Sequence, residues 1–256
     1  LSLHDAVNAF IANDKDLGKK AQRAADHVDA RSANLEAVCY NLIATQSPVA
    51  SDFRLLQTII YVNFNLQRMS DKVRRIARAA RHKVAQEIEL PAELVDLIER
   101  EAESVYRVLG ASVSALVNND LGIVLDLSNQ DEAVHEIYEQ FFRTFNRMNA
   151  EDMADDSSLD DLRRVIMVSR YLDRIAAISI DAAFRLTFLL TGQRLCADDL
   201  ADADEDELES MRVPAGEGVT LDPARDARYV AALAPDEVGE ALASLIEDGA
   251  DTEQTE

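Results

Sequence analysis

The sequence predicts an all-α protein made of two tandem three-helix bundles, followed by an acidic and largely disordered tail. Three observations support this prediction: a scarcity of turn-forming residues, a repeat at a constant offset, and apolar residues spaced as in long packed helices. The 256 residues include only 8 Gly and 5 Pro, and 48% of them are apolar. Such a composition favours helices, and the chain is long enough for one large or two small cores.

The repeat is found by adding 106 to residue numbers in the first third of the chain. The sequence FIAND at 10–14 then meets LVNND at 116–120, and LQRM at 66–69 meets LDRI at 172–175. The offset holds without a gap through three expected helices and the two loops between them. A register kept over that length indicates an internal duplication.

The duplication divides the chain into a first repeat over 1–84, a second over 85–193 and a tail over 194–256. In the second repeat the opening helix is expected to begin near Pro91, which suits a first helical turn. The equivalent position in the first repeat is 91 − 106 = −15, so we expect the first repeat to be truncated at its N-terminus.

The third helix of each repeat has the clearest pattern. Apolar residues recur at alternating steps of three and four, as in long helices that pack nearly antiparallel in a bundle. The predicted seam of the first repeat is Ile59, Val62, Leu66, Met69, Val73, Ile76 and Ala80. That of the second is Val165, Val168, Leu172, Ile175, Ser179, Ala182 and Leu186. The last helix is expected to end near Leu190, with Gly192 closing it.

The turn between the second and third helices lies at residues 45–56 and contains Pro48. Ser47 is expected to cap the third helix, with Pro48 at its first position, because proline needs no N–H partner there. Asp52 would then place a negative charge in the first turn, where the helix dipole favours it.

The net charge of −22 is concentrated in the tail. Residues 196–256 contain 19 Asp and Glu against 3 Arg, a net of −16, which leaves 29 acids against 23 bases in residues 1–195, a net of −6. A body without a basic excess does not favour a nucleic-acid partner. Within the tail, residues 235–246 are expected to form a short amphipathic helix. The tail is either a solvated linker without a binding role, or this helix binds a partner.

A cytoplasmic, non-enzymatic protein is predicted. Cys39 and Cys196 cannot form a disulfide framework, which suits a reducing compartment. No signal peptide is visible, and the longest apolar run, Arg174–Leu190, is interrupted by Asp181 and Arg185 and is too short to cross a bilayer. Phosphate-binding loops, nucleophile elbows and Cys–His pairs are not found.

A basic run at 72–83 stands out in this acidic chain. Its Arg74, Arg75 and Arg78 lie in the C-terminal half of the third helix, where the helix dipole favours cations. These arginines either form a solvated face that pairs with neighbouring acids, or they dock an acidic protein surface. The equivalent stretch, 178–189, has lost nearly all charge, so the outer faces of the two bundles are expected to differ.

Acidic residues four apart on helices form a second candidate site. Residues i and i+4 share one face, so two facing helices can offer several carboxylate oxygens to a cation. The pairs are incomplete here, since Gln67, Ala25 and Ala177 occupy one position of three of them. These acids are either ordinary surface residues or a weakened metal site. The remaining candidate ligands are Asp29, Asp71, Asp131, His135 and Asp173.

Four segments together resemble the PhoU family of phosphate-uptake regulators. They are the turn QSPVASDFR at 46–54, LQRMSD at 66–71, EIYEQFFR at 136–143 and LDRIAA at 172–177. The resemblance covers residues 1 to about 190 and implies a fold of two three-helix bundles.

The resemblance also implies a function. Members of this family are cytoplasmic regulators without enzymatic activity. They couple the ATPase of a phosphate ABC transporter to a sensor histidine kinase, restrain the phosphate-starvation response, and often form homodimers. They reach the membrane only through these partners. Several carry iron, zinc or other cations at paired acids, which implies a divalent or iron cation at the five candidate ligands above.

Two alternatives stay open. One is a metal-binding carboxylate bundle with a storage or redox role, in which the acidic side chains would bind the metal. The other is a helical adaptor of a different transport system, which would have the same fold.

Overall fold

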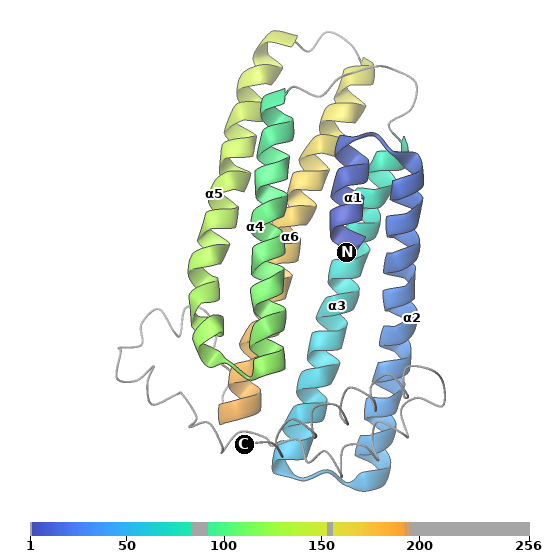
Figure 1. The fold of residues 1–256 in the computed structure, drawn as a ribbon, viewed down its shortest axis with the longest axis vertical. Helices are drawn as coiled ribbons and strands as arrows, with labels where there is room; N and C mark the ends of the chain where they lie inside the picture. The colour runs from blue at the N-terminus through green and yellow to red at the C-terminus, as the bar shows by residue number, and fades with distance from the viewer. Residues whose placement is uncertain (1, 83–91, 153–155, 193, 195–256) are drawn as a thin grey trace, which may run out of the picture.

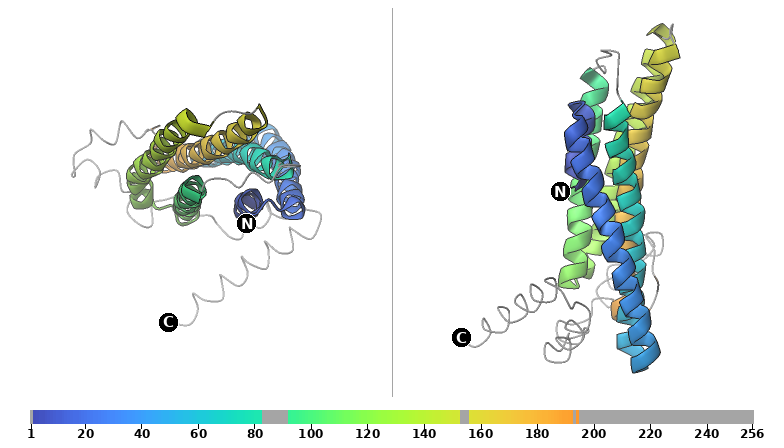
Figure 2. Two further views of the ribbon diagram at one scale, coloured as in Figure 1. Left: turned by 90° about the horizontal axis from the view of Figure 1, so that it is seen from above. Right: turned by 90° about the vertical axis from the view of Figure 1, so that its right-hand side faces the viewer.

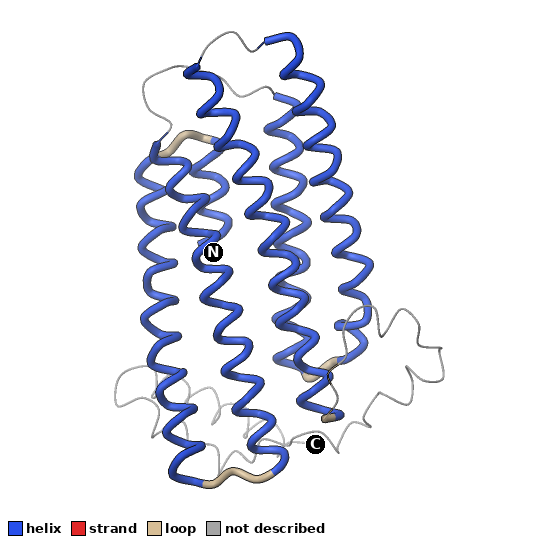
Figure 3. The backbone as a smooth tube through the Cα atoms, turned by 180° about the vertical axis from the view of Figure 1, so that it is seen from behind, coloured by secondary structure: helices blue, strands red, loops and turns tan. Residues whose placement is uncertain are grey.

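The computed structural model describes residues 2–82, 92–152, 156–192 and 194 (Figure 1). This part of the chain is helical and contains no strand (Figure 3), so the all-α prediction is confirmed. Its helices are α1 (Ser2–Ile11), α2 (Lys15–Gln46), α3 (Ala50–His82), α4 (Ala92–Asn118), α5 (Leu121–Asp152) and α6 (Asp156–Thr191). None of these helices is long and apolar enough to cross a membrane.

The helix boundaries repeat at the predicted offset. Adding 106 to the first and last residue numbers of α2, 15 and 46, gives 121 and 152, which are the bounds of α5. The same shift takes residue 50, where α3 begins, to residue 156, where α6 begins. The internal duplication is therefore present in the backbone as well as in the sequence.

The loops before α2 and α5 have the same local structure. Asn13 and Asn119 adopt left-handed backbone angles, with φ of 54° and 52°, which asparagine tolerates better than most residues. The next residue caps the helix. Asp14 accepts hydrogen bonds from the backbone N–H groups two and three positions on, at 2.9 and 3.0 Å, and Asp120 does the same at 2.8 and 3.3 Å. The Asn-Asp dipeptide thus starts a helix in both repeats.

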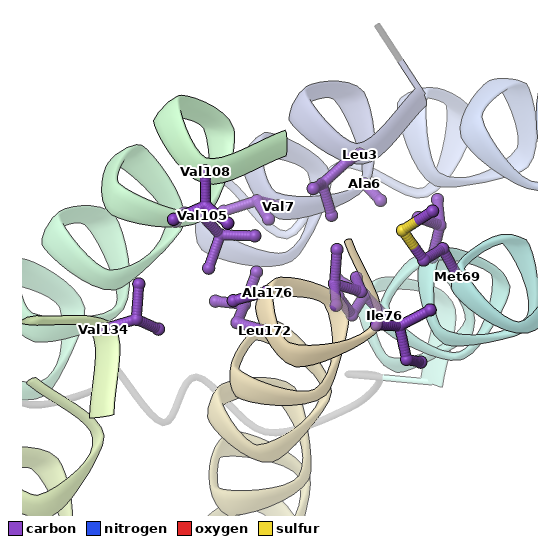
Figure 4. Packing of buried hydrophobic residues seen from close by; sticks show 14 of the residues in the cluster. Leu3, Ala6, Val7, Met69, Ile76, Val105, Val108, Val134, Leu172 and Ala176 are labelled. Carbon is purple, nitrogen blue, oxygen red and sulfur yellow. The ribbon is translucent and has the colours of Figure 1, made fainter. Parts of the chain in front are cut away.

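The helices form two three-helix bundles that share one core. Helices α1–α3 pack together, helices α4–α6 pack together, and α3 packs against α6 between them (Figure 1). Seen from above, α1 and α4 lie on the same face of the row formed by the other helices (Figure 2). Buried apolar residues of both bundles belong to a single cluster. In Figure 4, Val7 of α1 points toward Val105 and Val108 of α4, next to Leu172 of α6.

The predicted seam is correct in α6 and only partly correct in α3. All seven seam residues of α6 are buried, whereas in α3 only the last four, from Met69 to Ala80, are buried. Leu66 is 40% exposed, and the nearby Asn63 and Asn65 are buried instead. The reason is coverage: α1 has 10 residues against 27 in α4, and it lies beside only one half of α3 (Figure 1).

The turn between α2 and α3 differs from the prediction. Ser47 ends α2 in a left-handed conformation, with φ 47°, and α3 begins only at Ala50. Ser47 therefore does not cap α3, and Pro48 is not its first residue. The carbonyl of Val49 accepts the first hydrogen bonds of α3 instead. Helix α2 extends to Gln46, and Pro48 lacks the N–H needed to continue it, so Ser47 is used in stopping one helix rather than starting the next.

The end of α6 agrees with the sequence prediction. The helix stops at Thr191, and Gly192 has φ 78° with its N–H donated to the carbonyl of Phe188 at 3.0 Å. Pro91, the predicted tail beyond Arg194 and its helix at 235–246 lie outside the described residues.

Candidate functional site

The candidate ligands fall into two clusters, one in each bundle. We call the first, on α2 and α3, the first-bundle cluster: Asp26, Asp29, Asp71 and Arg74. We call the second, on α4, α5 and α6, the second-bundle cluster: Glu101, Asp131, His135, Ser169 and Asp173.

Arg74 is the centre of the first-bundle cluster. Its guanidinium donates from Nε to Asp26 Oδ1 at 3.0 Å and from Nη2 to Asp29 Oδ2, and its Nη1 lies 3.6 Å from Asp71 Oδ1. The Arg74 side chain is only 16% exposed, although the three carboxylates are each more open to solvent. One arginine on α3 therefore joins two carboxylates of α2 to one of its own helix.

The ionisation of this cluster follows from these contacts. Burial acts to raise the pKa of Asp71, but its ion pairs with Arg75 at 2.9 Å and Lys72 at 3.3 Å outweigh burial and lower the pKa. Burial likewise acts to lower the pKa of Arg74, and its bonds to Asp29 and Asp26 raise it instead. The first-bundle cluster is thus held in its charged form by opposite charges.

Glu101 is the centre of the second-bundle cluster. It is fully buried at 0% exposure, and the hydroxyl of Ser169 donates to its Oε2 at 2.6 Å. Its other oxygen, Oε1, is buried without a hydrogen-bond partner within the described ranges. Burial raises the pKa of Glu101 well above its ordinary value, and the nearby charge of Asp173 adds to the increase.

Two further members of this cluster, Asp131 and Asp173, also affect its ionisation. Burial, followed by the charge of Asp173, raises the pKa of Asp131. Nδ1 of His135 lies 3.6 Å from Asp173 Oδ1, but the His135 side chain is 61% exposed. The position equivalent to Arg74 is 74 + 106 = 180, which is the buried Ile180. The second bundle therefore has no guanidinium in the place where the first bundle has one.

Neither cluster has the geometry of a metal site. In the first, Asp29 and Asp71 contact Arg74, so their oxygens already have a cation as partner. Over the described ranges as a whole, no group of three or more His, Cys, Asp or Glu side chains is placed to hold a metal ion. The assignment of the five candidate ligands stays a prediction.

The three arginines proposed to bind partners differ in exposure. Arg74 is paired inside the molecule, as described above. Arg75 is half exposed, at 51%, with its guanidinium 6.0 Å from the centre of the Tyr171 ring, and Arg78 is exposed. Only Arg75 and Arg78 therefore present charge outward.

Two buried charged residues were not among the predicted site residues. Glu101 continues the apolar stripe of α4 that includes Leu97, Ile98 and Val105, and Arg185 interrupts the apolar end of α6. The signal in both cases was a charge among mostly apolar residues at helical spacing, which marks a buried polar group rather than a surface one.

Comparisons with known proteins agree with this architecture. A profile of the family described as the PhoU domain matches residues 1–80 and 98–185. The phosphate-specific transport system accessory protein PhoU homolog 1 of Methanothermobacter thermautotrophicus is 25% identical over 189 residues, covering 74% of this chain and 84% of that protein. The accessory protein PhoU of Escherichia coli is 23% identical over 209 residues, 82% of each chain.

A solved structure has the same fold. The crystal structure of PhoU from Pseudomonas aeruginosa superposes with a TM-score of 0.68 at 24% identity, covering 75% of this chain and 90% of that one. The profile match spans more than half of the sequence and falls on α1–α3 and on α4–α6. The chain therefore belongs to the PhoU family.

Proposed function

We propose that this protein is a cytoplasmic regulator of phosphate uptake and phosphate-starvation signalling. In this role it links the ATPase of a phosphate ABC transporter to a sensor histidine kinase and restrains the starvation response. The observation that carries the proposal is the family match over both bundles, with relatives named as accessory proteins of phosphate-specific transport systems. An adaptor of this kind needs a rigid body with chemically distinct outer faces rather than a catalytic centre.

The exposed surface of α3 supports this role. Arg75 and Arg78 present positive charge, and Phe53 and Phe64, on the half of α3 that α1 does not cover, are 42% and 56% exposed. Charges at the rim of an interface mainly speed association and set its salt dependence, while exposed aromatic residues supply contact area. We assign Arg75 and Arg78 to partner binding and Arg74 to holding α2 against α3.

Binding to purified partners tests the adaptor role. The full chain is titrated by surface plasmon resonance against the transporter ATPase and against the cytosolic part of the kinase. We expect saturable binding in the micromolar range, weakened about tenfold or more by the double change Arg75→Glu and Arg78→Glu, with a smaller salt dependence. Failure of both partners to bind at micromolar concentrations would contradict the proposal.

A matched control tests whether the loss of binding is specific to the α3 surface or follows from the change in net charge. Arg163 and Arg170 are exposed residues of α6, and changing both to Glu alters the net charge by the same amount. This control should bind the partners as the wild type does, since it leaves the α3 surface intact. Light scattering of the same samples tests the proposed homodimer.

The metal-binding alternative requires a separate measurement. Elemental analysis of protein purified without chelators determines whether iron, zinc or another cation is present in stoichiometric amount. Stoichiometric iron together with oxygen-dependent turnover would favour a storage or redox role over the adaptor.

A further inference from the structure

We propose that a small pocket between α3 and α6, which shares no lining residue with either acidic cluster, binds an oxyanion through arginine side chains. The pocket has a volume of about 250 Å³, including its open mouth. It is lined by Tyr61, Asp181, Phe184, Arg185, Phe188 and Arg194. The proposal rests on the contacts of these residues and does not depend on the proposed function.

Arg185 is the main reason for this proposal. It is only 7% exposed, and its guanidinium carbon lies 4.8 Å from the centre of the Tyr61 ring and 4.4 Å from that of Phe188. These rings stabilise the positive charge but do not accept conventional hydrogen bonds from it. Its Nε and Nη1 are buried with no hydrogen-bond partner in the part of the chain that the structure describes. Buried donors left in this state are costly, so a ligand that accepts from them would be stabilised.

A second arginine lines the same pocket. Arg194 is exposed, and burial together with the charge of Arg194 lowers the pKa of Arg185. Two cations at one pocket repel each other, and an anion between them relieves that repulsion. Asp181 is the only carboxylate among the described residues of the lining, and its Oδ2 already accepts from the hydroxyl of Tyr61 at 2.8 Å and the amide of Asn65 at 3.4 Å. The lining therefore keeps a net positive charge.

A third arginine lies at the same end of α6. Nη1 of Arg54 is 3.4 Å from the position that a Cβ atom on Gly192 would take, two residues before Arg194. The Nε of Arg54 is also buried without a hydrogen-bond partner among the described residues. Its charge adds to the positive potential near the pocket.

The pocket is an addition to the duplicated framework. The residue that corresponds to Arg185 is Ala79, since 185 − 106 = 79, and the residue that corresponds to Tyr61 is Met167, since 61 + 106 = 167. The repeat-equivalent positions thus have neither the cation nor the ring. A site built only once in a repeated structure points to a ligand rather than to a requirement of the fold.

The geometry of guanidinium identifies the class of ligand. Its N–H groups form a planar fork that matches the paired oxygens of phosphate, sulfate or carboxylate. Such a group can come from a free anion in solution or from the acidic stretch 198–209 of the same chain, which contains 8 Asp and Glu. The chemistry recognised is the same in both cases.

Isothermal titration calorimetry of the full chain with inorganic phosphate and with sulfate, at constant ionic strength, tests the site. We expect saturable binding that Arg185→Gln and Arg194→Gln each weaken about tenfold or more, since each removes charge-assisted hydrogen bonds. Arg194 is exposed, so its variant should keep the wild-type unfolding temperature and remains informative even if Arg185→Gln unfolds. Arg163→Gln, on an exposed residue of α6, should bind as the wild type does.

A further variant separates the two sources of the oxyanion. It has the acids of 198–209 changed to Asn and Gln. Tighter phosphate binding by this variant identifies the chain's own carboxylates as the competing group, and equal binding identifies the free anion. The proposal is overturned if neither the wild type nor this variant binds phosphate or sulfate saturably, or if Arg185→Gln and Arg194→Gln both bind normally while folded.

Discussion

The first-bundle cluster and the second-bundle cluster lie on repeat-related helices, yet they accommodate their acidic residues differently. In the first, Arg74 is surrounded by three aspartates from two helices. In the second, Glu101 is fully buried, with the hydroxyl of Ser169 as its hydrogen-bond donor. The position equivalent to Arg74 is elsewhere on α6 and is the buried Ile180. The first cluster is stabilised by opposite charge, and the second avoids part of the cost of burial because the raised pKa favours the neutral acid.

This difference shows what a duplication preserves. Helix boundaries, caps and the left-handed asparagines recur at the same offset because the backbone of each bundle needs them. The polar contacts between helices do not recur. The second bundle has Ile180 at the position equivalent to Arg74, so the guanidinium that joins α2 to α3 has no counterpart there. Two bundles of one fold can therefore differ in charge, pH response and the surfaces they offer to partners.

The largest effect is expected from removing the central arginine. Arg74→Met leaves three aspartates facing one another across α2 and α3, and should lower the free energy of unfolding by about 1–3 kcal/mol, below the cost for a fully buried pair because the carboxylates are partly exposed. Urea unfolding measures the change. Arg75→Met is the control and should cost less than about 1 kcal/mol, because its ion pair with Asp71 is half exposed. Equal losses for both variants would refute a central role for Arg74.

The second bundle should respond in the opposite sense when its buried acid is neutralised. The pKa of Glu101 is raised in the folded state, so the wild type loses stability as pH rises from the unfolded value, about 4.5, through the folded pKa. Glu101→Gln lacks this ionisation. We expect it to match the wild type near pH 4 and to exceed it by about 1–2 kcal/mol above neutral pH in urea unfolding. A difference that does not grow with pH would show that Glu101 ionises without cost.

Where the repeats agree, their variants should agree. Asp14→Ala and Asp120→Ala each remove an N-cap that satisfies two backbone N–H groups. Each should cost about 1 kcal/mol in thermal or urea unfolding. Unequal effects, beyond about 0.5 kcal/mol, would indicate that the two caps are not energetically equivalent.

The smallest effects concern single aspartates with opposite pKa shifts. The pKa of Asp71 is lowered, so its contribution to stability is present above about 3.8 and is lost as pH falls through the folded pKa. Asp71→Asn should therefore cost about 0.5 kcal/mol at pH 7 and less at pH 3. The pKa of Asp131 is raised, so Asp131→Asn should be neutral or slightly stabilising at pH 7. Urea unfolding at pH 3 and pH 7 measures both variants. The opposite pKa shifts would be contradicted if raising the pH changed the free energy of unfolding of both variants, relative to the wild type, in the same direction.

Much of the fold could be predicted from the sequence because backbone requirements leave local signals. The predicted offset of 106 and the predicted glycine at the end of α6 both appear in the structure, and the Asn-Asp dipeptide is a local signal at the start of α2 and α5. Leu66 and Ser47 were assigned wrongly for a different reason. The burial of Leu66 depends on how far α1 reaches along α3, and the role of Ser47 depends on where α2 stops.

The candidate site was less predictable. Asp29 and Asp71 were recognised as facing acids, but their partner Arg74 could be identified only from the packing of α2 against α3. Glu101 and Arg185 could be suspected as charges in apolar stripes. Their contacts with Ser169 and with the ring of Tyr61 join residues 68 and 124 positions apart, since 169 − 101 = 68 and 185 − 61 = 124, and a single sequence does not indicate such pairings.

The comparison of the two bundles is tested most directly by measuring carboxyl pKa values through carbon-13 NMR titration, with Glu101→Gln and Asp71→Asn used to assign the signals. Glu101 should titrate above its ordinary value of 4.5, while Asp71 should titrate below 3.8 in the same sample. A Glu101 signal that titrates at or below 4.5, or an Asp71 signal at or above 3.8, would contradict this account. In the account, burial favours the neutral acid at Glu101, and ion pairs favour the charged carboxylate at Asp71.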